Sequence, residues 1–334
     1  MSSRSWHRVL GLAVLLQAGA ACAESNDWLA RMAQAVRTQN YQGVLVYAQG
    51  GRMESMRITH RYLNGREQER LQALSGSDRE IHRDNDVVTC ILPKDRAVKV
   101  DRRAFRGLLP SLSRATVDEI GVHYELQELG SANVVGRACR AIAMRPRDAY
   151  RFGYRMWIDE ETSVPLKVEL LGPEGQTLEQ IMFTQISFPA HIDDKALEPG
   201  VDAKDFVWIR QRAPTAAAPV AAENWVAGKL PPGFRLVVHD QQLMPGLQEP
   251  VEHMVFTDGL ATVSAFIASQ GAPGKFKGLS RMGAVTAYAR MVDDFHVTVV
   301  GEVPQATVEL IASQLRYEPQ TVAAPAALAA PAGQ

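Results

Sequence analysis

Apolar residues fall on every second position in three successive runs between Arg145 and Phe188. Successive side chains of a strand point to opposite faces, so this alternation is typical of strands. One face of the first run holds Phe152, Tyr154, Met156 and Ile158. One face of the second run holds Leu166, Val168 and Leu170. Residues 172–175, rich in glycine and proline, supply a tight turn before the third run. The pattern predicts a three-stranded antiparallel meander.

The third run, from Leu178 to Ile186, is apolar on both faces. A strand covered on both sides lies inside a sandwich or inside a curved sheet that wraps around something. Such a curved sheet has either a filled core or a cavity for an apolar ligand. The pattern does not fix which face of the meander is the inner one, and the opposite face, which includes Trp157, is the alternative.

Shorter alternating segments precede the meander and are separated by turn residues such as Asn64-Gly65. These segments are Gly43–Tyr47, Met53–Tyr62, Arg66–Leu74, Glu80–Arg83, Asp86–Leu92, Tyr124–Val135 and Arg137–Met144. Together with the meander they predict one antiparallel sheet of about ten strands, long enough to curl. At the N-terminal side, helical spacing of four apolar residues predicts a short helix that packs on the core. They are Trp28, Leu29, Met32 and Val36.

Residues 93–120 break this succession of strands. Basic residues, among them Arg102, Arg103 and Arg106, alternate there with apolar ones. This composition suits a flap over a lipid-binding cavity, because an anionic amphiphile needs an apolar sleeve and cations at its mouth. The alternative is a solvated loop with one helical turn against the sheet.

A change of composition divides the chain into two domains. An Ala- and Pro-rich stretch without apolar periodicity connects them rather than packs. Beyond it, Asp258-Gly259 and Asp293-Asp294 are hairpin signals. After Pro304, apolar residues at helical spacing predict one helix. The predicted segments are a large domain over 24–208, a linker over 209–224, a small α+β domain over 225–318 and a disordered tail over 319–334.

Residues 1–23 have the layout of a cleaved signal peptide, with Arg4 and Arg8 before an apolar run and a small-residue site that ends at Ala23. A lipoprotein anchored on Cys22 is the alternative, and the run is too short for a transmembrane helix. Cleavage removes two positive charges and takes the formal net charge from −1 to −3. That charge argues against a nucleic-acid-binding protein.

Cys90 and Cys139 remain in the mature chain, both in predicted strands. Thiols can oxidise in the compartment of an exported protein, so a Cys90–Cys139 disulfide is one prediction. Two buried thiols that pack as small apolar groups are the alternative.

The sequence carries no recognisable catalytic constellation. Its histidines are scattered without metal-ligand spacing, and it has neither a phosphate-binding glycine loop nor a nucleophile elbow. Acidic pairs at 193–194 and 293–294 have the context of turns. We therefore expect a binding protein with no catalytic residues, no metal and no cofactor, and an enzyme ranks last.

Several short motifs occur along the chain in an order that is specific when they are taken together. They are Tyr41–Tyr47, Val135–Arg137, Arg145–Asp148, Tyr150–Asp159, Pro165–Lys167, Leu230–Phe234, Phe256–Ser264 and Val299–Pro304. This order resembles the RseB/MucB family, and the resemblance covers both domains, from Asp27 to Leu315.

The resemblance implies a periplasmic negative regulator of the envelope-stress sigma factor. Such proteins bind the periplasmic part of a membrane-spanning anti-sigma factor of the RseA/MucA type and shield it from a site-1 protease. The resemblance also implies an α+β protein whose large curled sheet is the unclosed barrel of the lipoprotein carriers LolA and LolB. This domain is expected to sense lipid or mislocalised lipopolysaccharide and then to release the anti-sigma factor. Members of the family can self-associate, and the sequence fixes no oligomeric state.

For the lipid we expect the inner face of the meander, with three arginines near the head group. These residues are Phe152, Tyr154, Met156, Ile158, Arg102, Arg103 and Arg106. For the partner, the resemblance points to the small domain and the cleft between the domains. We expect a contact at Lys275, Phe276 and Lys277, and a plain solvated loop is the alternative.

Arg145 and Asp148 match the family motif, and we expect them to fix a turn through a charge-assisted hydrogen bond rather than to touch a ligand. The runner-up function is a lipoprotein carrier. A carrier of that fold is usually a single domain, whereas a second domain follows here, and this favours regulation.

Overall fold

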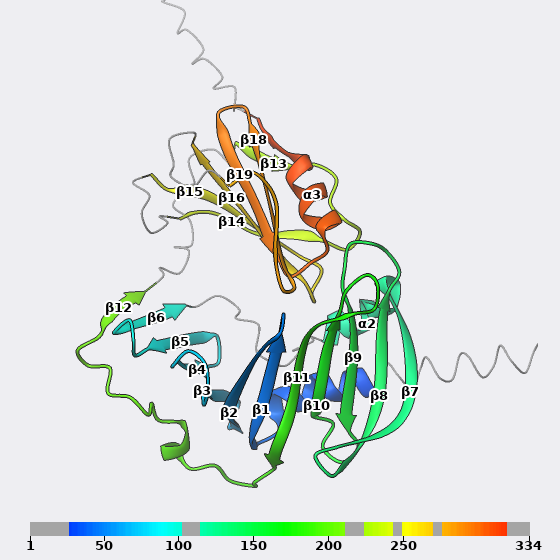
Figure 1. Ribbon diagram of the computed structural model, residues 1–334, viewed down its shortest axis with the longest axis vertical. Coiled ribbons are helices and arrows are strands. Elements are labelled where there is room, and N and C mark those ends of the chain that lie inside the picture. Colours follow the sequence, from blue (N-terminus) through cyan, green and yellow to red (C-terminus); the bar gives the residue numbers. More distant parts are fainter. Residues whose placement is uncertain (1–26, 102–113, 211–223, 243–248, 270–275, 319–334) are drawn as a thin grey trace, which may run out of the picture.

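A computed structural model describes residues 27–101, 114–210, 224–242, 249–269 and 276–318. Figure 1 shows a large domain built on one curled sheet and a small domain with its own sheet at one end of it. Within the described ranges, no helix is long and apolar enough to cross a membrane. The predicted signal peptide, most of the linker and the predicted tail lie outside these ranges.

The large domain is a twelve-stranded sheet in the order β12-β6-β5-β4-β3-β2-β1-β11-β10-β9-β8-β7. Its strands are β1 (Tyr41–Gln49), β2 (Arg52–Leu63), β3 (Arg66–Ala73), β4 (Glu80–Asp84), β5 (Val87–Leu92), β6 (Ala97–Asp101), β7 (Tyr124–Val134), β8 (Arg137–Pro146), β9 (Gly153–Asp159), β10 (Pro165–Leu171), β11 (Thr177–Ser187) and β12 (Val207–Arg210). The predicted meander is confirmed as β9-β10-β11, paired antiparallel throughout. The two end strands, β12 and β7, are not neighbours, so the sheet stays open.

Two strands and a helix of the large domain were not predicted. The segment 93–120, expected to be either a flap or a solvated loop with one helical turn, contributes β6, which pairs with β5, and α2 (Arg114–His123). Its central part, 102–113, lies outside the described residues. β12 pairs in parallel with β6 and ends at Arg210, so regular structure reaches two residues into the predicted linker. β12 leaves only a weak local signal, because it is short and its stability comes from a strand far away in the sequence.

A helix over residues 27–38 lies against the inner face of the large sheet (Figure 1). Its predicted apolar stripe is confirmed: Trp28, Leu29, Met32 and Val36 are all buried. They share one core cluster with residues of β1, β9, β10 and β11, among them Leu45, Met156, Val168 and Phe183. The helix therefore fills the concave side of the curled sheet at this level. A 3-10 turn, η1 (Asp194–Leu197), follows β11.

The small domain has a six-stranded sheet in the order β14-β15-β16-β19-β18-β17 and a separate β13–β20 pair. Its elements are β13 (Trp225–Ala227), β14 (Arg235–Gln242), β15 (Val251–Thr257), β16 (Thr262–Ser269), β17 (Gly278–Met282), β18 (Val285–Val292), β19 (Phe295–Gly301), α3 (Gln305–Gln314) and β20 (Leu315–Tyr317). The helix α3 packs across β18 and β19. The hairpins at Asp258-Gly259 and Asp293-Asp294 are confirmed, and so is the α+β class.

Candidate functional site

The small domain contacts the large domain at residues 148–152, which lead into β9, and at a second place around Glu179 on β11. We call these parts of the large domain and the small-domain residues that touch them the domain joint. The chain is extended into β9 directly after residues 148–152, so the joint is continuous with the strand that carries Met156 and Ile158 into the core. The joint has two parts, one around Arg151 and one around Glu179.

The side chain of Arg151 is completely buried in the joint. Its Nε donates to Asp258 Oδ2 at 2.9 Å, and its terminal nitrogens bond Asp148 Oδ2 and the carbonyl oxygen of Pro232. The guanidinium also lies 5.5 Å from the ring centroid of Phe234. Asp148 belongs to the large domain and the other three partners to the small one. One arginine therefore ties two elements of the small domain to the large domain.

Asp258 is almost fully buried and has a double role. Its Oδ1 accepts hydrogen bonds from the backbone N–H groups of Leu260 and Ala261, which fixes the β15–β16 hairpin, while Oδ2 faces Arg151. On the other side, Asp148 Oδ1 accepts from the Tyr150 N–H, so it fixes the turn that presents Arg151. The prediction that Asp148 fixes a turn is confirmed, whereas Arg145 is exposed. Both carboxylates depend on one buried cation, and a pair of this kind is costly to break.

Two further contacts support the Arg151 part. Thr307, buried in the first turn of α3, donates from Oγ1 to the Tyr150 carbonyl oxygen at 2.7 Å. Gly233, with φ of +80°, lies so close to His123 that a Cβ would come within 2.4 Å of its Nε2. A side chain at position 233 would thus be strained by its positive φ and would require the His123 ring to move.

The second part of the joint is a small apolar cluster of Phe152, Leu170 and Ala284, beside the carboxylate of Glu179. The carboxylate accepts hydrogen bonds from the Gln49 side chain and the Tyr47 hydroxyl of the large domain, and from the Ala284 N–H of the small domain. Burial raises the pKa of Glu179 first, and the negative charge of Glu302 raises it further. Burial and Glu179 likewise raise the pKa of Tyr47.

The predicted lipid face is the inner face of the meander. Met156 and Ile158 are fully buried in the large core cluster, and Tyr154 packs against it while half-buried. Phe152, expected beside them, belongs instead to the joint, because the small domain covers it through Ala284. At Met156 and Ile158 the core is filled by protein, so an acyl chain would have to displace packed side chains. Arg102, Arg103 and Arg106 lie outside the described residues.

The predicted partner contact lies beside β17, the edge strand of the small sheet. Phe276 is 37% exposed, and its carbonyl oxygen accepts a hydrogen bond from His296 Nε2. Lys277 is also exposed, whereas Lys275 lies outside the described residues. The residues are accessible, and their role as a contact stays a prediction.

Cys90 and Cys139 are free thiols in the structure, which does not contain the suggested disulfide. Cys90 lies on β5 and Cys139 on β8, and seven strands separate these two in the sheet order. Burial raises the pKa of both thiols, that of Cys139 to about 11. Cys139 is one of the buried residues of the large core cluster, as the alternative reading expected.

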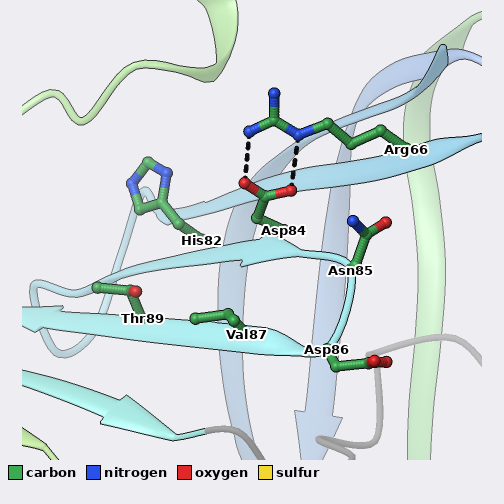
Figure 2. A pocket seen from close by; sticks show the side chains of 7 residues that line it. All are labelled: Arg66, His82, Asp84, Asn85, Asp86, Val87 and Thr89. Carbon is green, nitrogen blue, oxygen red and sulfur yellow. Dashed lines mark hydrogen bonds and ion pairs between the residues drawn. The ribbon is translucent and has the colours of Figure 1, made fainter. Parts of the chain in front are cut away.

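A shallow hollow of about 790 Å³ lies over β3, β4 and β5 (Figure 2). Arg66 and Asp84 form a two-point ion pair at its rim, and His82 and Thr89 line it. The guanidinium of Arg66 in this hollow is therefore already paired with Asp84. Among the described residues, no group of three or more His, Cys, Asp or Glu could hold a metal ion.

Sequence reasoning missed Arg151 and Asp258, although both lie in the motifs that carried the family resemblance. The alternation placed Arg151 only on the face of the first meander strand opposite Phe152, and Asp258 counted only as part of a hairpin signal. Their pairing joins residues 107 positions apart, and no local pattern encodes it. A signal was nevertheless present, since both stood in the same set of motifs.

Fold and joint define a two-domain binding protein, in which an open curled sheet is held to a smaller α+β domain by buried charges. Comparison with models of protein families identifies the family of this chain. The model of the MucB/RseB N-terminal domain matches residues 24–201, and that of the C-terminal domain matches residues 219–316. The chain belongs to the MucB/RseB family of regulatory proteins, as its motifs predicted.

Similar proteins span nearly the whole chain. The sigma factor AlgU regulatory protein MucB of Pseudomonas aeruginosa is 32% identical over 301 residues, 89% of this chain and 92% of that protein. The sigma-E factor regulatory protein RseB of Haemophilus influenzae is 26% identical over 92% of this chain and 96% of its own length. A chain of the solved Pseudomonas aeruginosa MucA/MucB complex covers 89% of this chain and 100% of itself, at 30% identity and a TM-score of 0.69.

Proposed function

We propose that this protein binds the periplasmic part of a transmembrane anti-sigma factor of the MucA/RseA type and keeps the sigma factor sequestered. The observation that carries the proposal is similarity to MucB over 89% of the chain, a stretch that includes both domains. The related chain was solved in complex with MucA, which makes a MucA-like segment the natural partner.

Binding in this proposal protects the anti-sigma factor from site-1 proteolysis, and lipid or a lipopolysaccharide fragment releases it. Thermodynamic linkage supplies the mechanism: a lipid that prefers the partner-free form must weaken partner binding by the same factor. The protein acts in the periplasm after residues 1–23 are removed. A binding role of this kind requires no catalytic residue.

The position of β9 supports a route between the two ligands. The strand begins beside Arg151 and Phe152 in the joint and ends in the core at Met156 and Ile158. An acyl chain that enters the core has to shift packed side chains on this strand, because close-packed cores transmit strain rather than absorb it. The displacement then reaches the joint within one strand length.

The test uses the mature chain, residues 24–334, and the periplasmic segment of its own host's anti-sigma factor. Calorimetry with and without a lipid-A fragment measures both affinities, and RT times the logarithm of their ratio gives the coupling free energy. Micromolar or tighter binding that lipid weakens supports the proposal. If the segment does not bind in either condition while the large domain captures an acylated peptide, the protein is instead a lipoprotein carrier.

Met156→Asp tests the lipid face, with Met53→Asp as the matched control, because Met53 is 70% exposed and Met156 only 1%. A buried carboxylate at position 156 is expected to abolish lipid binding and to leave the fold only marginally stable. The control should bind lipid like the unmodified chain. Unchanged lipid affinity in a folded Met156→Asp variant removes this face from the site.

A further inference from the structure

The small sheet ends at β17, and this edge strand has no partner on its outer side among the described residues. β17 pairs with β18 in an unbroken register from Gly278 to Met282, so alternate backbone N–H and C=O groups point away from the sheet. Its side chains are exposed on both faces, and Leu279 and Met282 are 42% and 72% exposed. An edge strand of this kind is a template for one further strand.

The other antiparallel edge strands of the two large sheets are interrupted. At the end of the large sheet, β7 has a register shift between Glu128 and Gly130, and Gly130 has φ of +89°. At the opposite edge of the small sheet, β14 has a register shift between Leu236 and Val238. Such bulges break the row of backbone groups that an added strand would need. In the part of the chain that the structure describes, β17 is the antiparallel edge of these sheets without such a shift.

Two cations accompany this edge. Arg281 lies on β17 and Lys277 directly precedes it; both are exposed, and neither forms an ion pair with a described residue. Arg281 shares a face of the strand with Leu279, because successive side chains alternate. Leu279 is in register with Tyr288, which packs against the core of the small domain. That face therefore offers an added strand an apolar position beside a free positive charge.

The edge is fixed at both ends. Where β17 begins, His296 Nε2 lies 2.6 Å from the carbonyl oxygen of Phe276. Where it ends, a Cβ at Gly283 would come within 2.6 Å of the Gln49 side chain of the large domain, and Ala284 belongs to the joint. A fixed edge loses little conformational freedom when it binds. A strand added there also ends beside the domain joint.

We propose that an extended, acidic segment of the anti-sigma factor adds to the free edge of β17 as a further strand of the small sheet. The backbone groups of β17 bind the segment, and Arg281 and Lys277 select one with carboxylates near an apolar residue. This inference rests on the proposed function, because it names the surface that holds the partner and the conformation and charge of the segment held.

Hydrogen exchange tests the added strand itself. In the mature chain, the β17 amides that point away from β18 have no strand to bond, so they should exchange fast. In the complex with the periplasmic segment of the host's anti-sigma factor, their protection should rise at least severalfold. The Val299 amide in the core strand β19 serves as an internal reference and should not change. Docking through side chains alone would leave the β17 amides unprotected.

Arg281→Glu tests the charge, and Arg235→Glu is the matched control. Arg235 is exposed on β14 at the opposite edge of the same sheet, and it forms no ion pair with a described residue either, so both variants change the net charge equally. Arg281→Glu should weaken binding of the segment severalfold and reduce its dependence on salt. Arg235→Glu should bind like the unmodified chain, and Arg281→Lys should keep most of the affinity. Because the substituted side chains are exposed, the free energy of unfolding should stay unchanged.

Two results overturn the inference. One is a complex that forms without new protection of the β17 amides. The other is an equal loss of affinity in Arg281→Glu and Arg235→Glu. If the unmodified chain does not bind the segment at all, the proposed function fails and this inference fails with it. Measuring the unmodified chain first therefore separates the two failures.

Discussion

The two parts of the domain joint are held together differently. Around Arg151, one buried cation is matched by two carboxylates and a carbonyl oxygen, so the charges attract across the boundary. Around Glu179, a half-buried carboxylate accepts hydrogen bonds from neutral groups, and burial is the first cause that raises its pKa. Removing one partner of a buried ion pair costs about 3–5 kcal/mol, whereas a neutral hydrogen bond contributes about 1 kcal/mol. The first part therefore specifies the arrangement, and the second adds smaller contributions to it.

Arg151→Met should cause the largest change, because it leaves the buried Asp258 and the partly buried Asp148 without their cation. Loss of one member of a buried ion pair typically costs about 3–5 kcal/mol. We expect the joint to separate, so that calorimetry resolves two unfolding transitions where the unmodified chain shows one coupled transition. Small-angle scattering should give a larger radius of gyration. Arg145→Met is the control, since Arg145 is exposed in the same region. A single transition at the original temperature in Arg151→Met would show that Arg151 does not hold the domains.

How far the sequence predicts this joint differs between its parts. The elements that carry it were predicted: the β9 meander strand, the Asp258-Gly259 hairpin and the C-terminal helix all have local periodicity or turn signals. The pairing of Arg151 with Asp258 was not, because it depends on how two independently patterned domains dock. The same reason explains the missed β12, which is stabilised by β6 more than a hundred residues earlier in the chain.

The inner face of the meander was predicted in part for a similar reason. Alternation correctly grouped Met156 and Ile158 on the inner face, because period 2 is a local property. It could not exclude Phe152 from that group, since the residue that covers it, Ala284, belongs to the other domain. The disulfide suggestion relied on compartment and residue count alone, and strand order separates the two cysteines.

Asp258→Asn should have a smaller effect than Arg151→Met. The amide oxygen can still accept from Leu260 and Ala261 and so keep the hairpin, but the charge opposite Arg151 is gone. Arg151 keeps Asp148, so we expect a loss of about 1.5–3 kcal/mol, the range of a hydrogen bond to a charged group. Denaturant unfolding monitored in both domains measures it. Asp293→Asn, in an exposed hairpin turn of the same domain, should be close to neutral. If Asp258→Asn and Asp293→Asn lost equal free energy of unfolding, the hairpin turn and not the ion pair with Arg151 would account for the effect.

Thr307→Val removes the hydroxyl that bonds the Tyr150 carbonyl and keeps the shape of the side chain. A neutral hydrogen bond contributes about 1 kcal/mol, and the carbonyl oxygen left behind is only partly buried. The joint should weaken slightly, visible as faster exchange of the Ala284 amide with little change at Val299. Thr184→Val is a fitting control, because its hydroxyl bonds a carbonyl within the large sheet, away from the joint.

Glu179→Gln should have the smallest effect and the opposite sign. The amide oxygen can still accept the Ala284 N–H, while the cost of burying an ionised carboxylate disappears. We therefore expect slightly greater protection of the Ala284 amide at pH 7.5. The gain should fade on acidification, because Glu179 of the unmodified chain is then protonated as well. A gain that persists unchanged at low pH would point to better packing of the amide rather than to removal of the buried charge.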